Sequence, residues 1–298
     1  MSILVGYGPH NNDRSAIELA CQLARSEHQP VHAVAVVPKG WGTPAAAGTD
    51  REFQAWANDE GEVGAEQARA DFALHPGVEA SASWVSGRSV PQSLLEQAAE
   101  RDAWVLVVGS SDEADRGRIR LSSKTDRLVH SAPVPVAIAP RGYRTDSPVT
   151  RVTVGFRDDD ASWSMLTRVA QMSRRVGARL RLVTFIVSPP RRSVTTTVTH
   201  AETQVFNQWM IQVGLAQREA ADYLQSKGFS EADLEFRIAE GYHWAAAIGS
   251  LEWADGDILV VGSSATNPVA RVFLGSSASK IVRNSPVPVI AVPGKGTD

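Results

Sequence analysis

The stretch that decides the fold begins with Asp257-Ile-Leu-Val-Val-Gly-Ser-Ser-Ala265, continues through Leu274-Gly-Ser-Ser277, and ends with Ser285-Pro-Val-Pro-Val-Ile-Ala-Val292. Its apolar run, residues 258–261, does not alternate with polar residues, which is typical of a parallel strand covered on both faces. The small residues after this run, and those that open the next predicted helix, leave backbone N–H groups accessible. Because a helix N-terminus also carries partial positive charge, the stretch favours binding of an anion such as phosphate.

Three segments of this chain occur twice, in the same order and about half the chain apart. The pairs are Ile3-Leu-Val-Gly-Tyr7 with Val152-Thr-Val-Gly-Phe156, Trp104-Val-Leu-Val-Val-Gly-Ser-Ser111 with Asp257-Ile-Leu-Val-Val-Gly-Ser-Ser264, and Ala132-Pro-Val-Pro-Val-Ala-Ile-Ala-Pro140 with Ser285-Pro-Val-Pro-Val-Ile-Ala-Val-Pro293. Such self-similarity indicates tandem copies of one structural unit. We therefore predict two domains, residues 1–141 and 151–298, with a loop between them.

Strands alternate with helices in both copies. The strands are predicted at residues 3–7, 31–37, 78–85, 104–108 and 134–139, and again at 152–156, 180–187, 234–239, 258–261 and 287–292. Such alternation produces a parallel sheet with helices on both faces. The predicted fold class is therefore α/β, with two tandem doubly wound five-stranded parallel sheets of strand order 3-2-1-4-5. Ligands of such sheets bind where the strand order reverses, beside the first and fourth strands, and the fourth strand carries the Gly-Ser turn.

Two prolines lie within the last predicted strand of each copy, namely Pro133 and Pro135, and Pro286 and Pro288. Proline cannot donate a ladder hydrogen bond, so such a strand is expected at a sheet edge. Two exposed edges in one chain can cover each other by pairing. We therefore expect the copies to associate through these strands as an internal pseudo-dimer with pseudo-two-fold symmetry. Whether the chain forms a further homo-oligomer stays open.

The composition excludes several classes of protein. With 298 residues and a net charge of −3, the chain is long enough for two domains and gives no electrostatic reason to expect a nucleic-acid partner. Cys21 is the only cysteine, which excludes an intramolecular disulfide, and its place on an apolar helix face predicts a buried thiol. No basic region precedes the first apolar run, and no run reaches the roughly 20 residues that span a bilayer. We therefore expect no membrane association and a cytoplasmic location.

The turn after the fourth strand carries a resemblance to a known family. In ATP-binding universal stress proteins this strand ends in Gly, two residues, Gly, nine residues, and Gly followed by Ser or Thr. The second copy keeps that spacing as Gly262, Ala265, Gly275 and Ser276, with alanine replacing one glycine. Over essentially its whole length the chain resembles the tandem, UspA-like universal stress proteins. The resemblance implies an adenine nucleotide alpha hydrolase-like fold and a regulatory role in the stress response.

The resemblance also implies a binding site for ATP or another adenine nucleotide. Ile186, at the end of the second strand, matches the family's aliphatic contact to adenine. The family's aspartate after the first strand falls on Arg157, and the neighbouring Asp158 could substitute for it. The phosphates would lie against backbone N–H groups of the motif and against serine hydroxyls, and a role for Mg²⁺ stays open. The implied nucleotide-binding residues are Ile186, Asp158, Gly262, Ser263, Ala265, Gly275, Ser276 and Ser277.

The first copy departs further from the family motif. Its corresponding positions are Gly109, Asp112 and Ser122, so two of the three glycines are replaced. Asp112, Glu113 and Asp115 place negative charge where phosphates would bind, and this charge opposes anion binding. By the family pattern the first copy is a degenerate, structural one. Nucleotide binding is therefore expected only in the second copy.

The sequence predicts no catalytic residue and no metal ligand. The resemblance allows slow ATP hydrolysis, but the serines of the motif have no adjacent base in the sequence. His243 is the one histidine expected near the crevice. The acidic run Asp158-Asp-Asp160 fits the N-terminus of a helix better than a metal site, because helix N-termini favour acidic residues.

Function classes other than a nucleotide-binding regulator remain open. One is a scaffold that binds no nucleotide and acts through its paired domains or its aromatic-rich helices. Segments 41–56 and 193–214 are unusually apolar, and they suggest a covering lid, a protein interface or a helix packed on the sheet. A weaker alternative is an adenylate-handling enzyme of similar topology. Whether nucleotide copurifies with the protein would separate the regulator from the scaffold.

Overall fold

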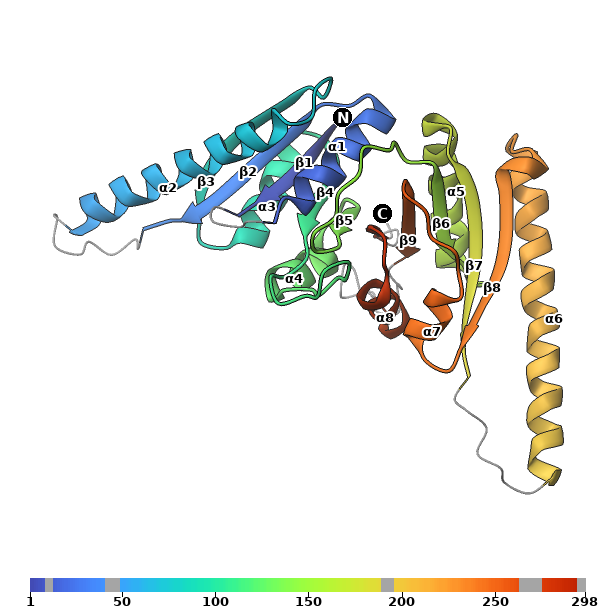
Figure 1. Ribbon diagram of the computed structural model, residues 1–298. Helices are drawn as coiled ribbons and strands as arrows, with labels where there is room; N and C mark the ends of the chain where they lie inside the picture. Colours follow the sequence, from blue (N-terminus) through green and yellow to red (C-terminus); the bar gives the residue numbers. More distant parts are fainter. Residues whose placement is uncertain (9–12, 41–48, 189–195, 263–274, 294–298) are drawn as a thin grey trace.

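The computed structural model describes residues 1–8, 13–40, 49–188, 196–262 and 275–293. Its strands form one ten-stranded sheet in the order β3-β2-β1-β4-β5-β10-β9-β6-β7-β8 (Figure 1). Read from its outer edge toward the middle of the sheet, each half has the predicted order 3-2-1-4-5. The two predicted sheets are therefore joined into one, and the sheet edges are β3 and β8.

The strands of the two halves correspond one to one. Those of the first half are β1 (Ser2–Tyr7), β2 (Val31–Pro38), β3 (Ala80–Gly87), β4 (Ala103–Gly109) and β5 (Val136–Ala139). Those of the second half are β6 (Arg151–Gly155), β7 (Arg179–Val187), β8 (Leu234–Gly241), β9 (Asp257–Gly262) and β10 (Val289–Val292).

Helices connect the strands as the alternation predicted. The first half has α1 (Ser15–Glu27), α2 (Thr49–Phe72), α3 (Val90–Glu100) and α4 (Ser123–Ser131). The second half has α5 (Asp160–Val176), α6 (Thr196–Ser226), α7 (Trp244–Gly249) and α8 (Ser276–Asn284). None of the helices in the described ranges has the length and apolarity required to cross a membrane.

The halves meet where β5 and β10 pair antiparallel, with Val289 opposite Ile138 and Ala291 opposite Val136. The prolines lie just before these strands and not within them, so the strands begin two residues later than predicted. Pro135 still serves the sheet, because its carbonyl accepts a hydrogen bond from the Leu106 N–H at 2.9 Å. Each last strand thus pairs on both sides, and the two expected edges cover each other.

Alternate residues along the strands point to opposite faces of the sheet and build two cores. On one face the strands pack against α1, α2, α5 and α6, and on the other against α3, α4, α7 and α8. In β1, for example, Ile3 and Val5 belong to the first core and Leu4 to the second. Cys21 is a free, buried residue of α1, as predicted, and burial raises the pKa of its thiol to about 12.

The loop between the halves is fastened to both of them. From the first half, the Gln22 amide donates to the Ser147 carbonyl at 3.2 Å. From the second half, the Asp255 carboxylate accepts hydrogen bonds from the hydroxyls of Thr145 at 2.6 Å and Ser147 at 2.7 Å. Burial would raise the pKa of Asp255, but these hydrogen bonds hold it below its ordinary value. The predicted loop is therefore a fixed connection.

Candidate functional site

The carboxyl ends of β6, β7 and β9 lie side by side at one end of the sheet. β6 pairs in parallel with β7 on one side and β9 on the other, and Val154 is aligned with both Leu182 and Val260. The chain leaves β6 toward β7, so the strand order reverses between β6 and β9. In doubly wound sheets this is where ligands bind, and the geometry places the candidate site here.

Two glycines end the central strands at this point. Gly262 is the last residue of β9, and a Cβ atom there would lie 3.2 Å from the Met165 Sδ of α5. Gly155 ends β6, and a Cβ there would lie 3.7 Å from the Phe185 ring. Helix α5 therefore packs closely against the end of β9, and a side chain at position 262 would need Met165 to shift.

Two predicted ligand contacts come from β7 and from the segment after β6. Ile186 is the second-last residue of β7 and only 4% of its surface is exposed. Asp158 is exposed, and its carboxylate accepts a hydrogen bond from the Trp163 indole N–H of α5 at 3.0 Å. Asp158 is thus held toward α5, while Ile186 offers little surface in this conformation.

The N-terminus of α8 carries the last three predicted residues. Gly275 is its N-cap, and Ser276 and Ser277 begin its nine-residue run. Within the described residues no side chain caps this end, and the first turn holds no acidic residue. The first hydrogen bond of the helical ladder runs from the Ser279 N–H to the Gly275 carbonyl at 3.0 Å. The N–H groups of residues 276–278 therefore precede the ladder, which leaves donors at this end for an acceptor outside the helix.

The middle of the predicted motif lies outside the described residues. Ser263 and Ala265 belong to residues 263–274, which the structure does not describe. Of the predicted set, the structure places Gly262 at the end of β9 and Gly275, Ser276 and Ser277 at the start of α8. Ile186 is the second-last residue of β7, and Asp158 follows β6.

The corresponding helix of the first half begins differently. The N-cap of α4 is Ser122, whose hydroxyl accepts a hydrogen bond from the Thr125 N–H at 3.1 Å, and Asp126 lies in the first turn. The helix thus satisfies one of its own donors and adds negative charge beside the others. An anion gains less from such an end than from an uncapped, neutral one.

The loop before α4 is held in place partly by contacts of its own side chains. Ala114 and Ile119 are buried, and Glu113 forms an ion pair with Arg120 at 2.8 Å. The Arg118 guanidinium donates to the Asn284 carbonyl, at the last residue of α8, at 3.2 Å. Arg120 therefore offsets the charge of Glu113, while Arg118 is bound to the end of α8.

Comparison with known proteins identifies the family. The universal stress protein family model matches residues 1–140 and 148–293. The chain belongs to the universal stress protein family. A curated universal stress protein of Mycobacterium tuberculosis is 36% identical over 302 residues, which cover 99% of this chain and 100% of that protein.

Solved structures of universal stress proteins share the fold. One from Archaeoglobus fulgidus covers 99% of this chain and 97% of its own length, with a TM-score of 0.58 and 16% identity. Another universal stress protein from Archaeoglobus fulgidus, in complex with dAMP, covers 47% of this chain and 97% of its own length, with 21% identity and a TM-score of 0.36. At that level of similarity its ligand is a property of that protein alone.

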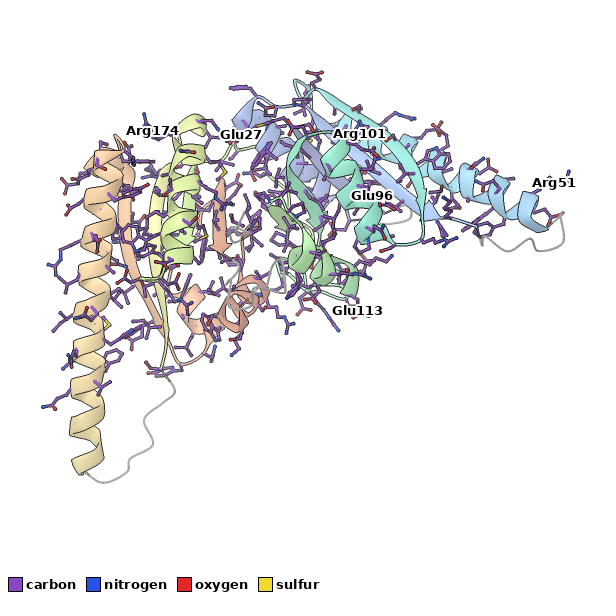
Figure 2. The ribbon with its side chains drawn as sticks, turned by 180° about the vertical axis from the view of Figure 1, so that it is seen from behind. Glu27, Arg51, Glu96, Arg101, Glu113 and Arg174 are labelled. Atoms are coloured by element: carbon purple, nitrogen blue, oxygen red, sulfur yellow. The ribbon has the colours of Figure 1, made fainter. Side chains whose placement is uncertain are left out.

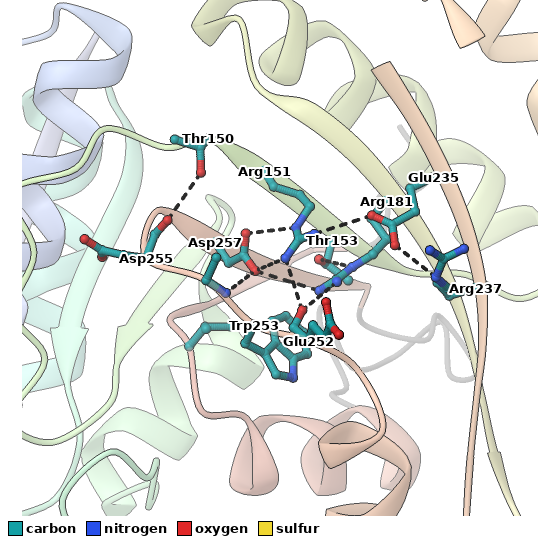
Figure 3. Close-up of polar contacts among 12 residues, drawn as sticks. Thr150, Arg151, Thr153, Arg181, Glu235, Arg237, Glu252, Trp253, Asp255 and Asp257 are labelled. Atoms are coloured by element: carbon teal, nitrogen blue, oxygen red, sulfur yellow. Dashed lines mark hydrogen bonds and ion pairs between the residues drawn. The ribbon is translucent and has the colours of Figure 1, made fainter. Parts of the chain in front are cut away.

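This universal stress protein also has a buried charged cluster that the sequence reasoning missed (Figure 3). It lies at the amino ends of β6, β7 and β9, opposite the candidate site. The Arg151 guanidinium donates two hydrogen bonds to the buried Asp257 carboxylate, at 2.9 and 2.6 Å. Arg181 is 1% exposed, donates to Thr153 Oγ1 at 3.0 Å, and lies over the Trp253 ring at 4.7 Å. In the sequence, Arg181 interrupts the apolar pattern of β7, and this interruption was the signal that could have indicated the cluster.

Other polar residues of this universal stress protein cap helices. His243 Nδ1 accepts a hydrogen bond from the Ala246 N–H at 3.1 Å and caps α7. Asp159 caps α5 by accepting from the Ser162 N–H at 2.8 Å, so the N-cap interpretation of the acidic run is confirmed. Among the described residues, no three His, Cys, Asp or Glu side chains are grouped so as to hold a metal ion.

Proposed function

We propose that this universal stress protein is a regulatory protein whose second domain, residues 151–298, binds an adenine nucleotide such as ATP. The site would lie at the carboxyl ends of β6, β7 and β9 and at the N-terminus of α8. The first domain, residues 1–141, would bind none and would act as the structural half of an internal pseudo-dimer joined through β5 and β10.

The contrast between α8 and α4 carries this proposal. Helix α8 begins at Gly275 with no side-chain cap and no acid in its first turn, within the described residues. Helix α4, at the same place in the first half, is capped by Ser122 and has Asp126 in its first turn. A phosphate gains from unsatisfied N–H donors and from the partial positive charge of a helix end. Both effects are stronger at α8.

Each proposed contact has a distinct chemical role. The N–H groups of the first turn of α8 and the hydroxyls of Ser276 and Ser277 would donate to phosphate oxygens. Gly262 would let the backbone approach the ligand closely. Ile186 would contact the base, and Asp158 would contact the nucleoside. Since Ile186 is nearly covered and Asp158 is bonded to Trp163, both would have to reorient on binding.

The test compares the same substitution at the two helix starts. Gly275→Asp keeps a good N-cap residue at a φ of −55°, so the helix should form, but it puts a carboxylate where the phosphate would lie. Ser122→Asp makes the matched change at α4. Isothermal titration with ATP should show binding by the native protein and by Ser122→Asp, and none by Gly275→Asp.

A second experiment looks for nucleotide bound during purification. Mass spectrometry of the supernatant after denaturation of the native protein should detect copurified ATP, ADP or AMP. Equal loss in both variants, or no binding by the native protein, would refute the proposal.

A further inference from the structure

Helix α6 is far longer than the strands on which it packs. Its 31 residues extend about 46 Å at 1.5 Å per residue. The neighbouring edge strand β8 has 8 residues and extends about 27 Å. In Figure 1, α6 runs on past the ends of β7 and β8, and Figure 2 shows from behind that side chains of this part project clear of the sheet.

The two parts of α6 differ in what covers them. Toward its C-terminus, Val213, Ala216, Ala220 and Leu224 are buried, and the last three belong to the core beneath the sheet. Among residues 204–212, whose side chains are described, none is buried. Among the side chains of this helix that the structure describes, the exposed large apolar ones are Val205 at 69%, Trp209 at 42%, Ile211 at 60% and Leu215 at 48%.

A row of glutamines runs along the exposed side of this part of α6. Gln204, Gln208 and Gln212 are all exposed and are spaced four residues apart, so they lie on one line along the helix. Helical geometry places Val205 and Trp209 on one side of this line and Ile211 and Leu215 on the other. We call these seven residues the glutamine face.

The glutamine face is free of charge. Residues 203–217 contain no Asp, Glu, Lys, Arg or His. The long helix of the first half is different: α2 also exposes Trp56 and Val63, but it carries acidic or basic residues in almost every turn. A solvent-facing helix surface is ordinarily charged, and depletion of charge together with aromatic enrichment is typical of the centre of a protein interface.

We propose that the glutamine face is a dimerisation surface that binds the same face of a second copy of this chain, with the two α6 helices antiparallel. An amide both donates and accepts hydrogen bonds, so a row of glutamines is complementary to an identical row, whereas a charged row would repel its copy. A two-fold axis at Gln208 sets Gln204 of one copy opposite Gln212 of the other. It also brings Val205 and Trp209 of both copies to the same side, where their apolar surface is removed from water.

A lipid surface fits this face less well. Helices that lie on membranes combine their apolar face with lysines and arginines that contact anionic headgroups. Arg218 is the first basic residue after the charge-free segment, and no lysine or arginine precedes it in α6. This dimer depends on neither nucleotide binding nor the assignment of the site to the second half.

Disulfide trapping tests the position of the axis. Gln208→Cys would put one thiol from each copy on the two-fold axis, and the only native cysteine, Cys21, is buried. Under mild oxidation the variant should form a covalent dimer on a non-reducing gel. Gln67→Cys, at an exposed glutamine of α2, is the matched control and should stay monomeric on the same gel. Equal cross-linking of the two variants would overturn the proposal.

Charge variants at the same position test the antiparallel pairing without oxidation. In analytical ultracentrifugation the native protein should sediment as a dimer. Gln208→Glu and Gln208→Lys should each sediment mainly as monomers, because like charges meet at the axis, and an equimolar mixture should restore the dimer. Position 208 is exposed, and circular dichroism would confirm that both variants fold. A monomeric native protein, dimers that persist in both variants, or a monomer that binds anionic phospholipid vesicles through this face would each refute the proposal.

Discussion

One buried histidine, His32, makes the stability of this universal stress protein depend on pH. His32 of β2 lies between two serines of β3, with its Nδ1 2.7 Å from Ser81 Oγ and its Nε2 2.7 Å from Ser83 Oγ. Burial, with a contribution from the nearby Arg101 guanidinium, lowers the pKa of His32 to about 4 from its ordinary 6.5. The neutral ring satisfies both hydroxyls, because one ring nitrogen accepts a hydrogen bond and the other donates one.

The pKa of His32 predicts an acid-dependent loss of stability. The unfolded chain binds a proton at His32 below pH 6.5, whereas the folded chain resists it until about pH 4. The free energy of unfolding should therefore fall as the pH is lowered through this window. Urea denaturation at several pH values, compared with His32→Asn, should show the gap between the two proteins changing between these values. Parallel stability curves would contradict the prediction.

The buried charges around Asp257 make a second residue-scale prediction. Asp257→Asn would remove the carboxylate that Arg151 grips and leave two cations close together, since Arg181 Nη2 lies 3.9 Å from the same carboxylate. The loss of one partner of a buried ion pair typically costs about 3–5 kcal/mol. Arg181→Met, which removes a buried cation whose Nη2 has no hydrogen-bond partner among the described residues, should cost much less. Urea denaturation of both variants measures the difference, and equal losses would contradict it.

At the scale of the elements, the apolar runs of the sequence predicted the ten strands that the structure describes. Their alternation with helices predicted the strand order within each half. The predicted start of the last strand in each half, and that of α6, were less accurate. The last strands were predicted to include the prolines, but they begin at Val136 and Val289, where both sides of the backbone can pair. The sequence predicts a helix at residues 202–227, but α6 begins at Thr196. Its first turns extend beyond the sheet, so they lack the helical apolar period that packing on the sheet requires.

The site elements were predictable only in part. The motif spacing located the end of β9 and the start of α8. Glycine and serine are typical of the end of a strand and the start of a helix, and such local preferences can be recognised in a sequence. It could not show that Asp158 bonds to Trp163 or that Arg118 reaches the end of α8, since those contacts join residues far apart along the chain or depend on side-chain direction. The arginine in β7 was visible in the sequence, but its partner Thr153 was not.

At the scale of the whole molecule, Asp255 holds the connecting segment to the second half. Asp255→Ala would leave the hydroxyls of Thr145 and Ser147 without their acceptor, so this segment should open more often. Trypsin should then cleave faster after Arg144, which is partly exposed, and the cleaved bond can be identified by mass spectrometry. Because the pKa of Asp255 is lowered, the carboxylate should keep accepting these two hydrogen bonds until the pH falls through that pKa. Unchanged cleavage in the variant would contradict this role.

The pairing of β5 with β10 lies within a single chain, and this has a consequence for how the two halves can change over evolutionary time. Separate subunits joined through the same strands would come apart on dilution, whereas tethered halves meet at a fixed effective concentration. Each half is therefore assured of its neighbour at any expression level. One half can then lose a ligand while it continues to supply the hydrogen-bonding strand that the other requires.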